Sequence, residues 1–416
     1  MRHKQLQTAT NGLAGRFASN AMRQVLGAGL FFATTLLLTR GLGSAGYATF
    51  FLNWNLAQIL VSVVSFGLYN DIVRRLATGE PAPKVIRQML MPHALQLALL
   101  AIAALVIAQL SDYDGVLLLM LAATATFGTL LTGVSLGRDA FRTFALGELL
   151  HNVVLLVLVA IVMPNGARDV GYLYVGAALA KLLFYFYSLP RNVAGAATDV
   201  AQSPAREDAT DISGSTSTRS IGSSYALRAY GHSLLQILSF RGFVLASGYL
   251  LPPGGMASLA IIWSFCDRAL TLVQGVNQIL YPRLIAGSVS QRMRTWMNVI
   301  TSAAYVLAVL GMLLLWVILA RFGLAAPLRV DYSAFALCIA FVPHVVRLLK
   351  MTEALAESRF TALFSSHAMT MLGFAIAGAF MLMMHTDSPW QPAVLIFIAS
   401  SLGLPAFYLL DRRPAA

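Results

Sequence analysis

Charged residues are scarce in this sequence. Asp, Glu, Lys and Arg make up 11% of the 416 residues, whereas soluble domains contain about 25%. Hydrophobic residues make up 58%, which excludes an ordinary soluble protein. The apolar runs are about 20 residues long, rather than the alternating runs of about 10 that build membrane β-barrels. We therefore expect an all-α integral membrane protein.

Cysteine and the common metal and nucleotide motifs are also nearly absent. Cys266 and Cys338 are the only cysteines, and both lie inside apolar runs, so no disulfide framework is indicated. The chain has no GxxxxGK(S/T), HExxH or CxxC motif. These absences argue against nucleotide binding through a P-loop and against a zinc site. We expect no cofactor and no metal.

Twelve apolar stretches of membrane-spanning length follow one another along the chain. Most are joined by short loops, so neighbouring spans should form antiparallel hairpins. The predicted spans are 20–39, 48–70, 89–110, 116–136, 143–163, 170–190, 229–251, 256–281, 297–320, 332–349, 362–384 and 393–410.

Lys and Arg are distributed unevenly among the loops. With both termini in the cytoplasm, most of the 29 Lys and Arg residues lie on the cytoplasmic side. The outer side would hold only Arg40, Arg168, Arg321 and Arg329. Positive charge marks cytoplasmic loops, so we predict a multi-pass protein with cytoplasmic N- and C-termini. Most of the basic residues behind the net charge of +12 then face the anionic inner leaflet. This placement indicates the lipid bilayer, and not nucleic acid, as the partner.

The longest cytoplasmic connection divides the spans into two sets of six. Residues 191–228 are rich in Ser, Thr, Ala and Gly, and we expect a disordered linker there. Residues 1–190 would form an N-lobe and residues 229–416 a C-lobe. These two pseudo-symmetric lobes would surround a central cavity.

A faint internal repeat supports this division. Thr39–Gly79 matches Pro252–Gly287, and the two segments occupy corresponding places in the predicted lobes. The residues that align at one constant offset are Gly46, Ala48 and Trp54 with Gly255, Ala257 and Trp263. Two similar lobes in a membrane chain are typical of carriers that rock one lobe against the other.

Three cations fall near the middle of predicted spans. They are Lys181, Arg241 and Arg268. Each costs roughly 2.5–3.5 kcal/mol to insert at the centre of a membrane helix, so each must face a partner or a watery cavity. The deep acids Asp267 and Glu148 are too few to neutralise all three. We predict a cavity with surplus positive charge that binds an anionic substrate such as a diphosphate; the structural alternative pairs Arg241 with Asp267.

Polar residues suggest further contacts in the same region. Glu148 and His151 share one helix face with Asn152, as candidates for ion coupling or for a polar helix contact. One Glu-x-x-His set is too few ligands for a metal site in a helical bundle. Candidates for a sugar path are Asn53, Asn55 and Gln58 in span two, and Gln274 and Asn277 in span eight. Polar helix packing explains these five equally well.

Several segments resemble a known family. TRGLGSAGYATFF (39–51) and FGLYNDIVRRLA (66–77) resemble the opening helices of bacterial oligosaccharide-lipid flippases, which belong to the multidrug/oligosaccharidyl-lipid/polysaccharide superfamily. LSFRGFVLASGYL (238–250) and ILYPRLIAG (279–287) resemble the start of their second half. Arg241 matches the basic residue that such proteins often carry in span seven. The chain departs from the family pattern in its length, because many relatives have fourteen spans.

The resemblance implies a transporter and not an enzyme. It implies flipping of an undecaprenyl-diphosphate-linked oligosaccharide across the bacterial inner membrane, for exopolysaccharide or lipopolysaccharide O-antigen biosynthesis. A polysaccharide polymerase and export machinery are the implied partners. One alternative is a drug/cation antiporter of the same superfamily. Another is a membrane polysaccharide polymerase or glycosyltransferase, which would need a sizeable outer loop that the sequence lacks.

Overall fold

The computed structural model is an assembly of α-helices. It describes residues 2–64, 68–110, 115–137, 141–201, 218–250, 253–285, 289–325, 332–384 and 391–409. The helices are α1 (Arg2–Val64), α2 (Leu68–Ala77), α3 (Ala82–Leu110), α4 (Gly115–Gly137), α5 (Phe141–Val162), α6 (Ala167–Ala201), α7 (Thr218–Leu250), α8 (Pro253–Ile285), α9 (Gln291–Arg321), α10 (Tyr332–Ala340), α11 (Val342–Ala356), α12 (Phe360–Met384), α13 (Gln391–Gly403) and α14 (Pro405–Leu409).

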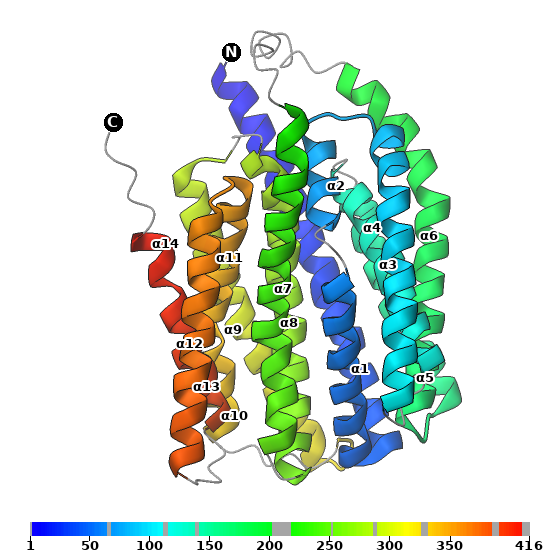
Figure 1. The fold of residues 1–416 in the computed structure, drawn as a ribbon, viewed down its shortest axis with the longest axis vertical. Coiled ribbons are helices and arrows are strands. Elements are labelled where there is room, and N and C mark those ends of the chain that lie inside the picture. The colour runs from blue at the N-terminus through cyan, green and yellow to red at the C-terminus, as the bar shows by residue number, and fades with distance from the viewer. Residues whose placement is uncertain are drawn as a thin grey trace.

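The helices form two groups that lie side by side. Figure 1 shows α1–α6, here called the N-half, next to α7–α14, here called the C-half. Contacts between the halves are made chiefly by α1 with α7 and α8, and by α2 with the same two helices. A single large apolar core runs through both halves, with Trp263 and Trp316 among its largest buried side chains.

Helix α1 is a hairpin of two arms that meet at Gly43. A straight helix of its 63 residues would be ~95 Å long, about three times the hydrocarbon thickness of a bilayer. Instead, Phe32 packs on Phe265 with ring centroids 5.4 Å apart, and the Tyr47 hydroxyl lies 2.8 Å from that of Ser264. Because both arms touch neighbouring residues of α8, the chain reverses between them. The arms correspond to predicted spans one and two.

Gly43 makes this reversal possible through its backbone conformation. Its φ of 67° and ψ of 172° lie in a region that is essentially restricted to glycine. We expect Gly43→Ala to destabilise the protein by about 1–3 kcal/mol, although a Cβ there would meet no atom within 4 Å. The matched control is Gly29→Ala, at a helical glycine that is equally free of contacts. Thermal unfolding in detergent should show a lower Tm for the first variant only; equal Tm values would contradict the assignment.

The predicted twelve spans are consistent with these helices. Nine described helical stretches are long and apolar enough to cross a membrane; the two-armed α1 counts once among them, and α10 and α11 together form another. The polar α7 lies outside those nine, as do the shorter α13 and α14. Proline divides the last spans: Pro343 and Pro405 lack the N–H that would continue α10 and α13, so α11 and α14 start as separate helices.

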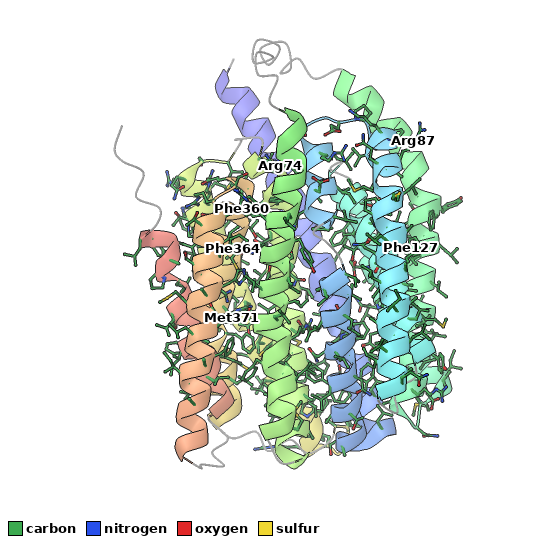
Figure 2. All side chains as sticks on the ribbon, viewed as in Figure 1. Arg74, Arg87, Phe127, Phe360, Phe364 and Met371 are labelled. Atoms are coloured by element: carbon green, nitrogen blue, oxygen red, sulfur yellow. The ribbon has the colours of Figure 1, made fainter. Side chains whose placement is uncertain are left out.

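The ends of the bundle differ in charge. Figure 2 shows Arg74 and Arg87 at the end that also holds the N-terminus of α1. At this end Arg75 donates to both carboxylate oxygens of Glu80, at 3.1 and 2.8 Å, and holds the pKa of that carboxyl below its usual range. We call this end the basic end. That it faces the cytoplasm stays a prediction.

The linker region differs from expectation at its edges. We predicted disorder over 191–228, but α6 extends to Ala201 and α7 begins at Thr218. Residues 202–217 lie outside the described part of the chain. The two copies of the repeat also differ: the first is divided between α1 and α2, whereas the second falls largely within the single helix α8. Gly67 and Gly287 of the repeat are not among the described residues.

Candidate functional site

The interface between the halves has three layers. The layer at the end opposite the basic end is apolar and closed. Tyr47 and Ser264, both buried, are hydrogen-bonded across the interface there. Phe32, Phe265 and Trp316 pack beside them with ring centroids 5.4–5.8 Å apart. This layer leaves no polar path among the residues named.

The middle layer is charged and is centred on Arg241 of α7. Its Nη2 lies 3.0 Å from Oδ2 of Asp267 on α8, and its Nη1 donates to Oδ1 of Asn55 on α1 at 2.9 Å. Asn55 is oriented by its own Nδ2, which donates to the Phe51 carbonyl at 2.7 Å. The structure thus pairs Arg241 with Asp267, which was the alternative to a role in binding an anionic substrate. Asn55 adds a contact from the N-half.

Lys181 of α6 is also paired. It forms an ion pair with Glu148 of α5, and its Nζ lies 5.8 Å from the centroid of the Tyr185 ring. Tyr185 can lie this close to α5 because residue 147 is glycine: a Cβ there would be 2.7 Å from the tyrosine ring. His151 packs near Tyr174, with ring centroids 6.1 Å apart.

Arg268 has a different environment. Its guanidinium carbon lies 3.6 Å from the centroid of the Phe31 ring, a cation–π contact between the C-half and the N-half. Within the described residues, no carboxylate oxygen lies within 4.0 Å of it. Of the three predicted cavity cations, Lys181 and Arg241 are thus neutralised by protein, and Arg268 rests on an aromatic face.

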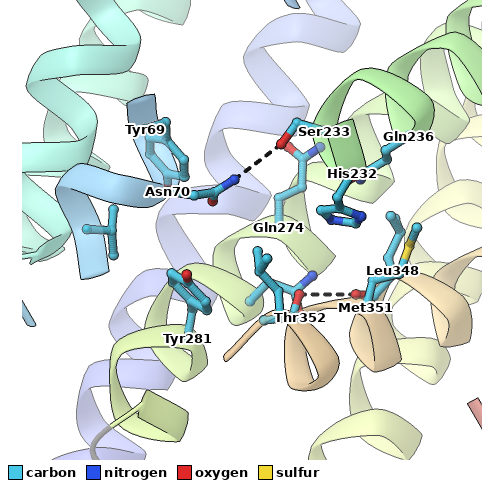
Figure 3. A pocket seen from close by; sticks show the side chains of 13 residues that line it. Tyr69, Asn70, His232, Ser233, Gln236, Gln274, Tyr281, Leu348, Met351 and Thr352 are labelled. Carbon is cyan, nitrogen blue, oxygen red and sulfur yellow. Dashed lines mark hydrogen bonds between the residues drawn. The ribbon is translucent and has the colours of Figure 1, made fainter. Parts of the chain in front are cut away.

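The third layer, toward the basic end, contains a cavity of about 240 Å³. Amides, hydroxyls and an imidazole line it together with apolar side chains, and none of the described lining residues is Asp, Glu, Lys or Arg. The lining residues come from both halves: Tyr69, Asn70, Val73, His232, Ser233, Gln236, Gln274, Asn277, Tyr281, Leu348, Met351, Thr352 and Leu355. Figure 3 shows Asn70 of α2 facing Ser233 of α7, where the amide donates to the hydroxyl at 3.2 Å. This bond joins the halves at the cavity.

The cavity contains part of the predicted sugar path. Gln274 and Asn277 line it, and Oδ1 of Asn277 is buried with no partner among the described residues. Asn53 and Gln58 are not among its lining residues, and Asn55 is engaged with Arg241. Sequence reasoning missed Asn70, His232 and Gln236. Their signal was a polar residue within or beside an apolar run.

Comparison with solved structures identifies the architecture. A MATE transporter in its straight conformation matches with a TM-score of 0.65 at 15% identity, covering 95% of this chain and 94% of that chain. An outward-facing multidrug resistance transporter of the MATE family and MOP superfamily matches at 0.62, 15% identity, with coverages of 95% and 94%. The fold is that of the MATE transporters.

A further match to the MATE fold is a mutant of the Vibrio cholerae transporter VcmN, with a TM-score of 0.60, 17% identity and 97% coverage of both chains. These neighbours are described as MATE transporters. At this level of identity the likeness shows the fold, and it does not test the flippase family that the sequence resembles. No protein-family model and no curated protein sequence matches the chain.

Proposed function

We propose that the protein is a membrane transporter that works by alternating access between its two halves. The observation that carries the proposal is the layered interface: a cavity with amide and hydroxyl groups in its wall lies toward one end, and buried aromatic packing closes the other. A cargo in the cavity would leave toward the basic end once the Asn70–Ser233 bond breaks, and toward the opposite end once the Tyr47–Ser264 contact opens. The MATE fold of the solved neighbours supports this mode of action.

Export of an organic compound, driven by a cation that moves in the opposite direction down its gradient, is the activity that the comparisons support best. One structural neighbour is described as a multidrug resistance transporter. Pairing of Lys181 and Arg241 with carboxylates removes much of the surplus positive charge that would disfavour cationic cargo. Glu148 and Asp267, each half-buried and paired with a lysine or arginine, are the carboxylates through which a cation gradient would be coupled.

Flipping of an undecaprenyl-diphosphate-linked oligosaccharide is the second candidate. The sequence resemblance favours it, and so does the cavity lining, because amides and hydroxyls are the groups that hydrogen-bond sugars. Arg268 would be the cation available to a diphosphate, because Lys181 and Arg241 are paired with carboxylates. In this case the protein would act in the bacterial inner membrane, with its termini in the cytoplasm and a polysaccharide polymerase downstream.

Transport by purified protein in liposomes distinguishes the two candidates. We expect gradient-dependent movement of a fluorescent organic cation if the first is correct, and exposure of a lipid-diphosphate oligosaccharide on the far leaflet if the second is. Gln274→Leu should reduce whichever activity is present by tenfold or more, because it removes a cavity hydrogen-bonding group. Gln109→Leu, at an exposed position of α3, is the control and should leave it unchanged. Absence of both activities in the wild type would refute the proposal.

A further inference from the structure

A fully buried arginine lies inside the C-half, away from the interface cations. The Arg347 side chain of α11 has 0% exposure. Its Nε donates to the Ser366 hydroxyl at 3.1 Å and its Nη2 to Nδ1 of His367 at 2.8 Å, but its Nη1 has no partner among the described residues. None of the ion pairs of the described residues includes it. A buried cation without a counter-charge is strongly unfavourable in a membrane protein.

Arg347 lines a small enclosed cavity between α7, α8, α11, α12 and α13. The volume is about 10 Å³, close to the smallest space that holds one water-sized occupant. Four of the ten lining residues are Phe or Trp, and the hydroxyl-bearing residues are Ser239, Thr370 and Ser400. Among the described residues, no Asp or Glu lines this cavity. The space is therefore suited to one small occupant beside a guanidinium.

Two further features place a hydrogen-bond donor or a partial positive charge at this cavity. Trp263 lines it, and its indole Nε1–H is buried without a partner in the described part of the chain. The N-terminus of α11 also meets it, because the N-cap residue Phe341 and His344 in the first turn are both lining residues. Phe341 provides no side-chain cap, and the positive end of the helix dipole favours an anion.

We propose that this cavity is a binding site for a small monovalent anion, of which chloride is the commonest in water. An anion would accept from Nη1 of Arg347 and from Trp263, and would supply the counter-charge that the protein lacks. A water molecule could accept the same hydrogen bonds but could not neutralise the guanidinium. The histidines cannot do so either, because Arg347 has only donors and His367 must accept from it as a neutral ring.

The hydrogen bonds connect this anion site with the transport cavity. Since Nδ1 of His367 accepts from Arg347, its proton lies on Nε2, which is 2.9 Å from Nδ1 of His232. His232 in turn lines the interface cavity. Occupancy of the anion site thus fixes the position of Arg347 and, through two imidazoles, the tautomer of a residue that faces the cargo.

Thermal unfolding of the purified full-length protein tests the site. The Tm is measured while sodium gluconate is replaced by sodium chloride or sodium bromide at constant ionic strength. We expect a saturable rise of about 3 °C or more in both halides, because a ligand that binds only the folded state stabilises it. Arg347→Met should abolish the rise. Equal Tm values for the wild type in all three salts would overturn the proposal.

A matched pair of tryptophan variants keeps the test valid if Arg347→Met fails to fold. Trp263→Phe removes the indole N–H at the cavity while keeping an aromatic ring, and should weaken the halide response about tenfold. Trp316→Phe makes the same change at another buried tryptophan, on α9, outside the cavity. It should leave the halide midpoint unchanged. Identical midpoints for Trp263→Phe and the wild type would also overturn the proposal.

Discussion

Asp267→Asn is expected to lower the stability of the protein by about 3–5 kcal/mol and to abolish transport. The substitution leaves Arg241 charged in the middle layer of the interface, where its side chain is only 12% exposed. Asn55 can still accept one hydrogen bond but supplies no negative charge. Arg241→Gln should have a similar effect, because it strands the Asp267 carboxylate instead.

Removing both charges together should recover most of the lost stability. In the double variant Arg241→Gln/Asp267→Asn, neither charge remains without its partner, and neutral amides can hydrogen-bond to each other and to Asn55. A double-mutant cycle measured by thermal unfolding gives the coupling between the two positions. Restored stability without restored transport would assign the charges to function rather than to folding.

The control for this cycle is an ion pair at the basic end. Lys84 and Glu80 lie 3.8 Å apart, and their side chains are 60% and 35% exposed. Such pairs contribute about 1 kcal/mol or less. Lys84→Gln/Glu80→Gln and its single variants should therefore change stability little. If the Arg241 and Asp267 variants behaved like these controls, the middle layer would not be the buried network that we describe.

Much of the fold follows from the sequence. The length of the apolar runs predicts the helices. The distribution of Lys and Arg among the loops predicts which residues lie at the same end of the bundle, as Arg74 and Arg87 do. The sequence places the first turn within residues 40–47 but does not single out Gly43 from Gly41 and Gly46, because a positive φ leaves no signature beyond the glycine itself. The break between α10 and α11 has a signal in Pro343, but an apolar span with one proline can remain a continuous kinked helix.

The candidate site was less predictable. The sequence marks Lys181, Arg241 and Arg268 as deep charges, yet pairing depends on which helix faces meet. Glu148 and Lys181 pair because α5 and α6 are adjacent, which a count of acids and bases does not specify. Arg347 lies near the end of the predicted span 332–349, where sequence alone does not tell a basic residue at the edge of a membrane from one inside the protein, whereas the structure buries it completely. Its signal was the pair of histidines, His344 on its own helix and His367 in the next apolar run.

Cross-linking the two halves at the cavity is expected to stop transport completely. Asn70 and Ser233 come from opposite halves, and their side chains are 3.2 Å apart across the interface. In Asn70→Cys/Ser233→Cys, a short bifunctional methanethiosulfonate, which forms a disulfide with each thiol, should join α2 to α7 and hold the cavity in one state. The two native cysteines, Cys266 and Cys338, are buried and should not compete for the reagent. Cleavage of the cross-link by a reductant should restore activity.

The control cross-link lies within one half. Ile72 of α2 and Gly133 of α4 are both in the N-half, and a Cβ at residue 133 would be 3.6 Å from that of Ile72, a separation that suits a disulfide. Both positions are buried, so the two thiols of Ile72→Cys/Gly133→Cys should be joined directly as a disulfide by an oxidant, and not by the reagent. The joined helices would move together, so transport should continue.

The most direct test of the account is therefore transport in liposomes by Asn70→Cys/Ser233→Cys before cross-linking, after it and after reduction, beside the Ile72→Cys/Gly133→Cys control. Alternating access predicts loss and recovery for the pair across the interface and continued activity for the pair within one half. Undiminished transport with α2 and α7 covalently joined would contradict the claim that the halves separate during each cycle.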